Sequence, residues 1–165
     1  MGQLLIERSL QAFTDTESLG AALARCVPWT APQALTVFLQ GELGAGKTTL
    51  VRGLLRGLGV EGTVRSPTYT LLECYETPAG RVLHLDLYRL AGGAEVASLG
   101  LRDELDSGVL LLIEWPERAV EALPPTDLCI KLSLAAVGRI ARLEAASPVG
   151  AAWLATAASA YGSQK

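Results

Sequence analysis

Residues 41–48 read G-E-L-G-A-G-K-T and restrict the fold of this chain more than any other segment. They match the phosphate-binding loop pattern G-x-x-x-x-G-K-[ST] at every fixed position. The glycines permit backbone turns that a Cβ would block, so that successive amide N–H groups can point inward and cradle phosphate oxygens. In such a loop Lys47 adds a positive charge near the β and γ phosphates, and the hydroxyl of Thr48 can ligate Mg²⁺.

The sequence on either side of the loop is what a phosphate-binding loop requires. An apolar, partly β-branched run at 35–40 precedes it, and residues 49–58 follow with leucines at helical spacing. A strand, the loop and a helix are therefore predicted in that order. We expect this segment to bind a nucleotide through Glu42, Leu43, Gly44, Ala45, Gly46, Lys47, Thr48 and Thr49.

Size and charge narrow the class of protein. The chain has 165 residues, half of them hydrophobic, which suits one domain with a sizeable core. A net charge of −3 argues against a broad electrostatic grip on nucleic acid, which needs a basic face. No apolar run approaches the length that crosses a bilayer, and the first residues lack the regions of a signal peptide. We therefore expect a cytoplasmic protein with no membrane contact.

Scarce residue types exclude two further kinds of chemistry. The cysteines Cys26, Cys74 and Cys129 lie far apart and there is one histidine, so a zinc site is not expected. We interpret the cysteines as reduced core residues. The chain contains no asparagine, so the N-K-x-D motif with which GTPases recognise guanine cannot be present.

The remaining patterns alternate between helix and strand. Capping-box spacing at 14–17 predicts the start of a first helix, which Pro28 ends. Two antiparallel hairpins are predicted, one from 69–76 with 81–88 and one from 127–134 with 139–145. Short helical pieces are expected at 94–99 and 101–106, and the apolar run 109–113 predicts a buried central strand.

These elements together predict an α/β fold. We expect a single P-loop NTPase domain with a mostly parallel central sheet, added antiparallel hairpins and helices on both faces. This ATPase domain is placed at residues 1–147, and residues 148–165 are interpreted as an Ala-rich tail that forms a short helix. The ligand is expected at the carboxyl ends of the parallel strands.

Two acids follow apolar strands and are candidates for catalysis and metal binding. Asp86 ends the segment 81–86 within the predicted strand 81–88, and Glu114 directly follows the apolar run 109–113. A carboxylate in this position can hold Mg²⁺ or order the attacking water. The alternatives are a solvated acid at a strand end for Asp86 and a helix-capping acid for Glu114. The pattern leaves open which of the two ligates the metal.

A loop and an aromatic residue complete the candidate site. The hydroxyl of Thr68, in the S-P-T sequence at 66–68, can reach the γ-phosphate or its Mg²⁺, and such loops order around a triphosphate. A simple turn is the alternative. Trp115 directly follows Glu114 and could stack on a base, form part of a partner surface or pack in the core.

Four motifs in this order resemble one family. They are GELGAGKTT at 41–49, SPTYTL at 66–71, HLDLYRL at 84–90 and IEWPE at 113–117. The combination is similar to the TsaE family, also called YjeE, over roughly 16–145. Members of this family are bacterial ATPases required for the threonylcarbamoyladenosine modification of tRNA.

The resemblance implies an activity, cofactors and partners. It implies that ATP is bound with Mg²⁺ and hydrolysed slowly. The implied partners are TsaD-like and TsaB-like proteins, which perform the carbamoyl transfer, so that tRNA would be contacted only indirectly through the complex.

The resemblance also implies roles for individual residues. Thr48 and Glu114 would coordinate Mg²⁺, Asp86 would be the acid tied to hydrolysis, and Thr68 would be the switch hydroxyl. Trp115 would lie near the nucleotide or the partner face. A further residue, Thr16, matches a family position near the nucleotide base, although the residues alone favour helix capping equally.

Two other functions fit a phosphate-binding loop. A small-molecule or nucleotide kinase usually needs an Arg-rich lid, whereas residues 92–106 contain a single arginine and several acids. A non-catalytic nucleotide sensor would need Lys47 but neither of the two strand-end acids. ATP turnover without a phosphorylated acceptor would separate the ATPase from the kinase.

Overall fold

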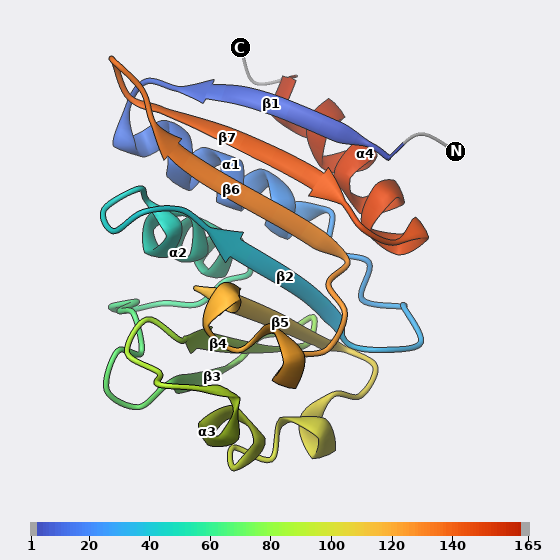
Figure 1. The fold of residues 1–165 in the computed structure, drawn as a ribbon. Coiled ribbons are helices and arrows are strands. Elements are labelled where there is room, and N and C mark those ends of the chain that lie inside the picture. Colours follow the sequence, from blue (N-terminus) through green and yellow to red (C-terminus); the bar gives the residue numbers. More distant parts are fainter. Residues whose placement is uncertain (1–2, 163–165) are drawn as a thin grey trace.

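The segment around the glycine loop has the predicted structure. Strand β2 (Leu35–Gln40) leads into the loop, and helix α2 (Lys47–Gly57) begins at the lysine of the loop. This computed structural model describes residues 3–162. Figure 1 shows β2 in the middle of one sheet with α2 behind it.

Within residues 3–162, seven strands form the sheet, in the order β1-β7-β6-β2-β5-β4-β3. The four middle strands, β6, β2, β5 and β4, are parallel to one another. The predicted hairpins β3–β4 and β6–β7 add antiparallel strands on either side, which confirms the predicted sheet. The strands after β2 span Leu72–Glu76 (β3), Arg81–Asp86 (β4), Val109–Glu114 (β5), Leu128–Leu134 (β6) and Arg139–Ala145 (β7).

Strand β1 (Leu5–Leu10) is absent from the sequence prediction. It pairs antiparallel with β7 at one edge of the sheet. Leu10 is fully buried whereas Leu5 remains exposed, so only part of the strand contributes to the core. A short edge strand of this kind carries little of the hydrophobic alternation that identifies a strand in a sequence.

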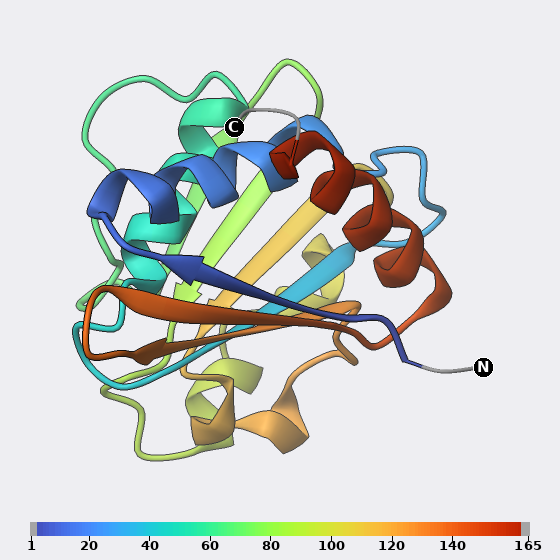
Figure 2. The same ribbon diagram turned by 90° about the horizontal axis from the view of Figure 1, so that it is seen from above.

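Helices cover both faces of the sheet, as predicted (Figure 2). Helices α1 (Phe13–Arg25), α2 and α4 (Pro148–Gly162) lie on one face, and α3 (Gly93–Ala97) lies on the other. The described part of the chain also contains the 3₁₀ turns η1 (Leu101–Glu104), η2 (Pro116–Arg118) and η3 (Val120–Ala122). Strand β5 is buried throughout because its side chains alternate between the two resulting apolar cores. This confirms it as a central strand.

The start of α1 differs from the sequence prediction. The helix begins at Phe13, and the carboxylate of Asp15 accepts hydrogen bonds from the backbone amides of Gln11 and Ala12, both at 2.9 Å. The predicted capping box at 14–17 is therefore wrong, because Thr14 already lies within the first turn. Helix capping by Thr16 is wrong for the same reason.

Helix α4 agrees with the helix predicted for the tail over 148–162, and residues 163–165 of that prediction lie outside the described residues. The helix packs against the main core. The indole of Trp153 is buried, and its Nε1 donates a hydrogen bond to the backbone carbonyl of Leu23 at 3.0 Å. Within residues 3–162, no helix has the length and apolar character needed to span a bilayer.

Candidate functional site

The backbone of the glycine loop has conformations that favour glycine. Gly41 and Gly46 have φ angles of 143° and 109°, which residues with a Cβ rarely adopt. A Cβ at Gly41 would also collide with the carbonyl oxygen of Leu132 on β6. Gly46 caps α2, so the free amides of the first helical turn face the space in front of the loop. This arrangement suits an anion such as a phosphate group.

The side chain of Lys47 contacts carbonyl oxygens of the loop and the ring of Trp115. Its Nζ donates hydrogen bonds to the carbonyl oxygens of Gly41 and Glu42, the second at 3.0 Å, and lies 4.0 Å from the ring centre of Trp115. Burial lowers the pKa of Lys47 below its ordinary value, and nearby carboxylates, Glu114 first, oppose that shift. The loop therefore contains a cation that is largely withdrawn from solvent.

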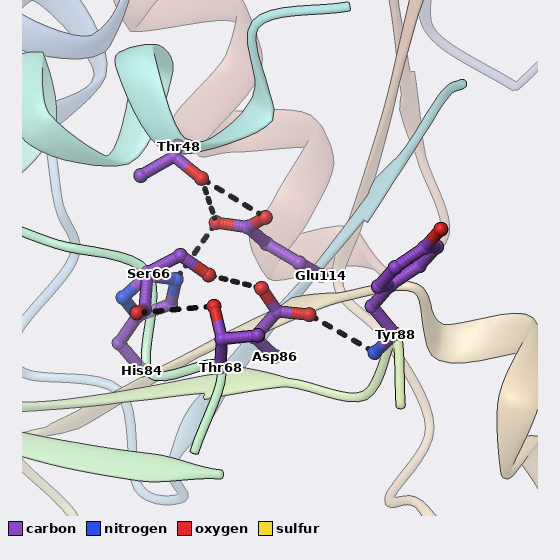
Figure 3. Close-up of polar contacts among 7 residues, drawn as sticks. All are labelled: Thr48, Ser66, Thr68, His84, Asp86, Tyr88 and Glu114. Atoms are coloured by element: carbon purple, nitrogen blue, oxygen red, sulfur yellow. Dashed lines mark hydrogen bonds and ion pairs between the residues drawn. The ribbon is translucent and has the colours of Figure 1, made fainter. Parts of the chain in front are cut away.

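Thr48 and Glu114 lie in direct contact (Figure 3). The Thr48 hydroxyl donates to the Glu114 carboxylate, with Oγ1 at 2.9 Å from Oε1 and 3.2 Å from Oε2. Glu114 is nearly fully buried, and its Oε1 also lies 2.9 Å from Nε2 of His84. The alternative of a helix-capping acid is wrong, because this carboxylate turns toward α2 and β4 instead of the turn that follows it.

Asp86 lies beside Glu114 because β4 and β5 pair in parallel with these two residues in register. Its carboxylate accepts a hydrogen bond from the Ser66 hydroxyl and one from the backbone amide of Tyr88, the latter at 3.0 Å. Asp86 is also buried, so the alternative of a solvated acid is wrong. Both predicted acids therefore meet at one end of the parallel strands.

The S-P-T loop lies over these acids. The Thr68 hydroxyl is 3.4 Å from the carbonyl oxygen of Ser66, and the Thr68 amide donates to the same oxygen at 2.8 Å. This is a local turn, whose Ser66 hydroxyl joins it to Asp86 (Figure 3). A switch role for Thr68 stays a prediction.

Trp115 has an unusual backbone. Its φ of 60° and ψ of 46° lie in the left-handed region, which non-glycine residues rarely adopt and which often marks functional sites. This turn places the indole against Lys47 and 4.9 Å from the ring of Tyr88, centre to centre. The side chain is half-buried and lines the cleft. Its contact with a nucleotide or a partner stays a prediction.

A cleft of about 510 Å³ joins most of the predicted residues. The predicted residues that line it are Leu43, Gly44, Gly46, Lys47, Thr48, Thr49, Thr68, Asp86, Glu114 and Trp115. Glu42, Ala45 and Thr16 do not line it. Thr16 is fully buried, and its hydroxyl has no hydrogen-bond partner within residues 3–162. Its contact with a nucleotide base stays a prediction.

Several lining residues are absent from the predicted site, among them Phe13, Tyr88 and Arg139. Arg139 begins β7, and its Nη2 donates to the carbonyl oxygen of Gly44 at 3.3 Å. Strand register places it there, because β6 and β7 are antiparallel and Arg139 pairs with Leu134 at the end of β6. No local sequence signal indicates this position, whereas Tyr88 could be found from the alternation of β4.

The oxygen atoms at the inner end of the cleft suit Mg²⁺. One hydroxyl and one carboxylate, from Thr48 and Glu114, are hard oxygen ligands in contact with each other. Mg²⁺ is commonly held by one or two such protein groups together with substrate phosphates and waters. The residues present therefore fit this ion, next to a loop whose sequence matches the phosphate-binding pattern.

The fold and this site define a class of protein, the single-domain P-loop NTPase-like α/β proteins. A sequence model of the family described as "Threonylcarbamoyl adenosine biosynthesis protein TsaE" matches residues 10–141. The chain belongs to the TsaE family.

Individual relatives agree with this assignment. A Haemophilus influenzae protein is 46% identical over 100 residues, which cover 61% of this chain and 63% of that protein, less than two thirds of its length. A Treponema pallidum protein is 36% identical over 135 residues, covering 81% of this chain and 93% of that protein. Both are named tRNA threonylcarbamoyladenosine biosynthesis protein TsaE. The crystal structure of YdiB from Bacillus subtilis is similar in fold, with a TM-score of 0.75 at 24% identity over 96% of this chain and 97% of that one.

Proposed function

We propose that this chain binds ATP with Mg²⁺ in the cleft and hydrolyses it slowly. It would act as the ATPase subunit of the system that installs threonylcarbamoyladenosine on tRNA. Membership of the TsaE family supports a place in that biosynthesis. The observation that carries the ATPase proposal is the contact between Thr48, at the start of the loop helix, and Glu114, at the end of the neighbouring strand.

In this proposal, residues at different positions in the cleft have different roles in ATP binding and hydrolysis. The loop amides and Lys47 would bind the phosphates, and Thr48 with Glu114 would hold Mg²⁺, which supplies charge neutralisation when bound. Asp86 would be the acid tied to hydrolysis, because it lies beside Glu114 and is joined to the S-P-T loop through Ser66. We therefore propose Glu114 as the carboxylate that ligates the ion. Among the hydrogen bonds of residues 3–162, Glu114 contacts Thr48 and Asp86 does not.

In this proposal, slow turnover and dependence on partner proteins have the same structural cause. In the structure the Asp86 carboxylate accepts a hydrogen bond from the Ser66 hydroxyl, and Lys47 donates hydrogen bonds to carbonyl oxygens of the loop. Both groups would exchange these hydrogen bonds for others during turnover. TsaD-like and TsaB-like proteins in the cytoplasm would promote that exchange, and tRNA would be contacted only through them.

The kinase alternative gains no support. The residues considered for a lid, 92–106, form α3 and η1 and do not line the cleft. Val96 and Leu101 are instead buried in the core that covers β4 and β5. This segment is therefore a structural cover of the sheet.

The proposal is tested by calorimetry and by an ATPase assay on the full chain. We expect heat of binding with ATP and Mg²⁺, and none with the Lys47→Ala variant, because the loop loses its only cation. Lys131→Ala, an exposed lysine outside the cleft, serves as the matched control. Phosphate release should be slow for the chain alone and faster with a TsaB–TsaD pair. Absence of binding heat for the folded wild-type chain would contradict the proposal.

A further inference from the structure

His84 is a buried polar residue that the proposed function leaves without a role. It lies on β4, is fully shielded from solvent and does not line the cleft. Its Nε2 lies 2.9 Å from Oε1 of Glu114. Its Nδ1 has no hydrogen-bond partner within residues 3–162. Among the described residues, the contact with Glu114 is therefore the single polar interaction of this ring.

The direction of the hydrogen bond follows from the chemistry of the two groups. An ionised carboxylate can only accept, so Nε2 of His84 must carry the proton that it donates to Glu114. Oε1 of Glu114 then receives two hydrogen bonds, from His84 on one side and from the Thr48 hydroxyl on the other. Oε2 has only the longer contact with Thr48. The imidazole thus fixes Oε1, whereas Oε2 has fewer hydrogen bonds and can still accept a further ligand.

The fold supplies this anchor through strand register. His84 pairs with Leu112 on β5, and Asp86 pairs with Glu114, so His84 and Glu114 are diagonal neighbours on the same face of the sheet. Their side chains project toward α2, where Thr48 lies (Figure 3). No water is needed to connect them, and both are almost completely buried.

We propose that His84 is a positioning residue that fixes the carboxylate of Glu114 and thereby sets the affinity of the site for Mg²⁺. The inference rests on the proposed function, because it assigns Glu114 to the ion. Partners that orient a metal ligand typically change metal affinity by about 10–100-fold when they are lost. His84 would act entirely through Glu114, since it does not reach the cleft itself.

The test compares nucleotide affinity with and without the ion, using calorimetry on the full chain. ATP is titrated once in EDTA and once in excess Mg²⁺, and the ratio of the two dissociation constants measures the contribution of the ion. His84→Leu removes the donor. His84→Gln and His84→Asn are a matched pair of amides, of which the longer one places its N–H near the position of Nε2.

We expect the ratio to fall about 10–100-fold in His84→Leu and His84→Asn, and to be largely retained in His84→Gln. Affinity in EDTA should stay unchanged in all three. Binding of Mn²⁺ in the presence of ADP, followed by electron paramagnetic resonance, should weaken in the same order. If His84→Leu proves unfolded by circular dichroism, the amide pair alone decides.

Two results would overturn the role of His84. One is an unchanged ratio in both His84→Asn and His84→Leu. The other is an equal loss of affinity with and without Mg²⁺, which is what a purely structural histidine would produce. A wild-type chain that binds no ATP at all would instead contradict the proposed function on which this inference depends.

Discussion

At the scale of single residues, the two strand-end acids have different surroundings although they lie side by side. Glu114 is bonded to the loop helix through Thr48, whereas Asp86 is bonded to the S-P-T loop through Ser66. A carboxylate buried without partners would be costly, and each of these has at least two. These different surroundings support the proposed division, in which Glu114 would hold the metal ion and Asp86 would serve hydrolysis.

Alanine substitutions of these acids should block turnover and spare much of the nucleotide binding. We expect Asp86→Ala and Glu114→Ala each to slow ATP hydrolysis by about 10²-fold or more, because positioning and charge stabilisation are lost while the loop remains. Only Glu114→Ala should also raise the Mg²⁺ concentration needed for half-maximal binding. Phosphate release and calorimetry measure the two effects.

An exposed acid provides the control for this pair. Glu121 lies in η3 outside the cleft, so Glu121→Ala should hydrolyse ATP as the wild type does. Hydrolysis retained in both acid variants would show that the role assignments are wrong.

At the scale of elements, glycines set the distance between α1 and α2. A Cβ at Gly53 of α2 would collide with the backbone of Glu17, and one at Gly20 of α1 would collide with the carbonyl oxygen of Leu50. The two helices therefore pack backbone to backbone. This contact holds α2, whose first turn contains Thr48, close to α1, which begins at Phe13 in the cleft.

Gly53→Ala should destabilise the protein even though alanine is the better helix former. The gain in helix propensity is about 1 kcal/mol, whereas forcing an added methyl into a tight contact costs about 1–3 kcal/mol and more when backbone must move. We expect a net loss in the free energy of unfolding, measured by urea denaturation. Gly92→Ala is the control, because Gly92 is extended and has no atom near the added Cβ. A Gly53→Ala protein as stable as the wild type would refute the packing argument.

At the scale of the whole molecule, the two ends of the described chain close one side of the fold. Strand β1 and helix α4 come from opposite ends, and both lie against α1 and the β6–β7 side of the sheet (Figures 1 and 2). Trp153 is the largest buried side chain of α4 and reaches the end of α1 through Leu23. The Ala-rich helix is therefore part of the core that supports the loop helix.

Trp153→Ala should lower the free energy of unfolding by about 3–5 kcal/mol, because it removes a fully buried aromatic side chain. Trp153→Phe keeps most of the apolar contact but loses the hydrogen bond to Leu23 and some buried volume, so a smaller loss of about 1–2 kcal/mol is expected. Denaturant unfolding of both variants measures the difference. Equal stability of Trp153→Ala and the wild type would show that α4 is a dispensable appendage.

Local chemistry explains why much of the site could be predicted from the sequence. The loop from Gly41 to Thr48 is a contiguous motif whose backbone preferences are local, and Asp86 and Glu114 each stand directly behind a recognisable strand. Parallel strands end at the same edge of a sheet, so their meeting was also predictable. The buried run of β5 and the two hairpins follow from hydrophobic pattern and turns in the same way.

Tertiary structure alone decided the contacts between segments that are distant in the sequence. The anchor between His84 and Glu114 depends on the register of β4 against β5, and the place of Arg139 beside Gly44 depends on the pairing of β7. Strand β1 shows the same limit, because an edge strand is stabilised mainly by its partner. The sequence by itself therefore determined the glycine loop between β2 and α2, the fold class and which two acids stand at the strand ends. Packing and register determined which side chains hold those acids in place, because the contacts involved join residues that no local pattern connects.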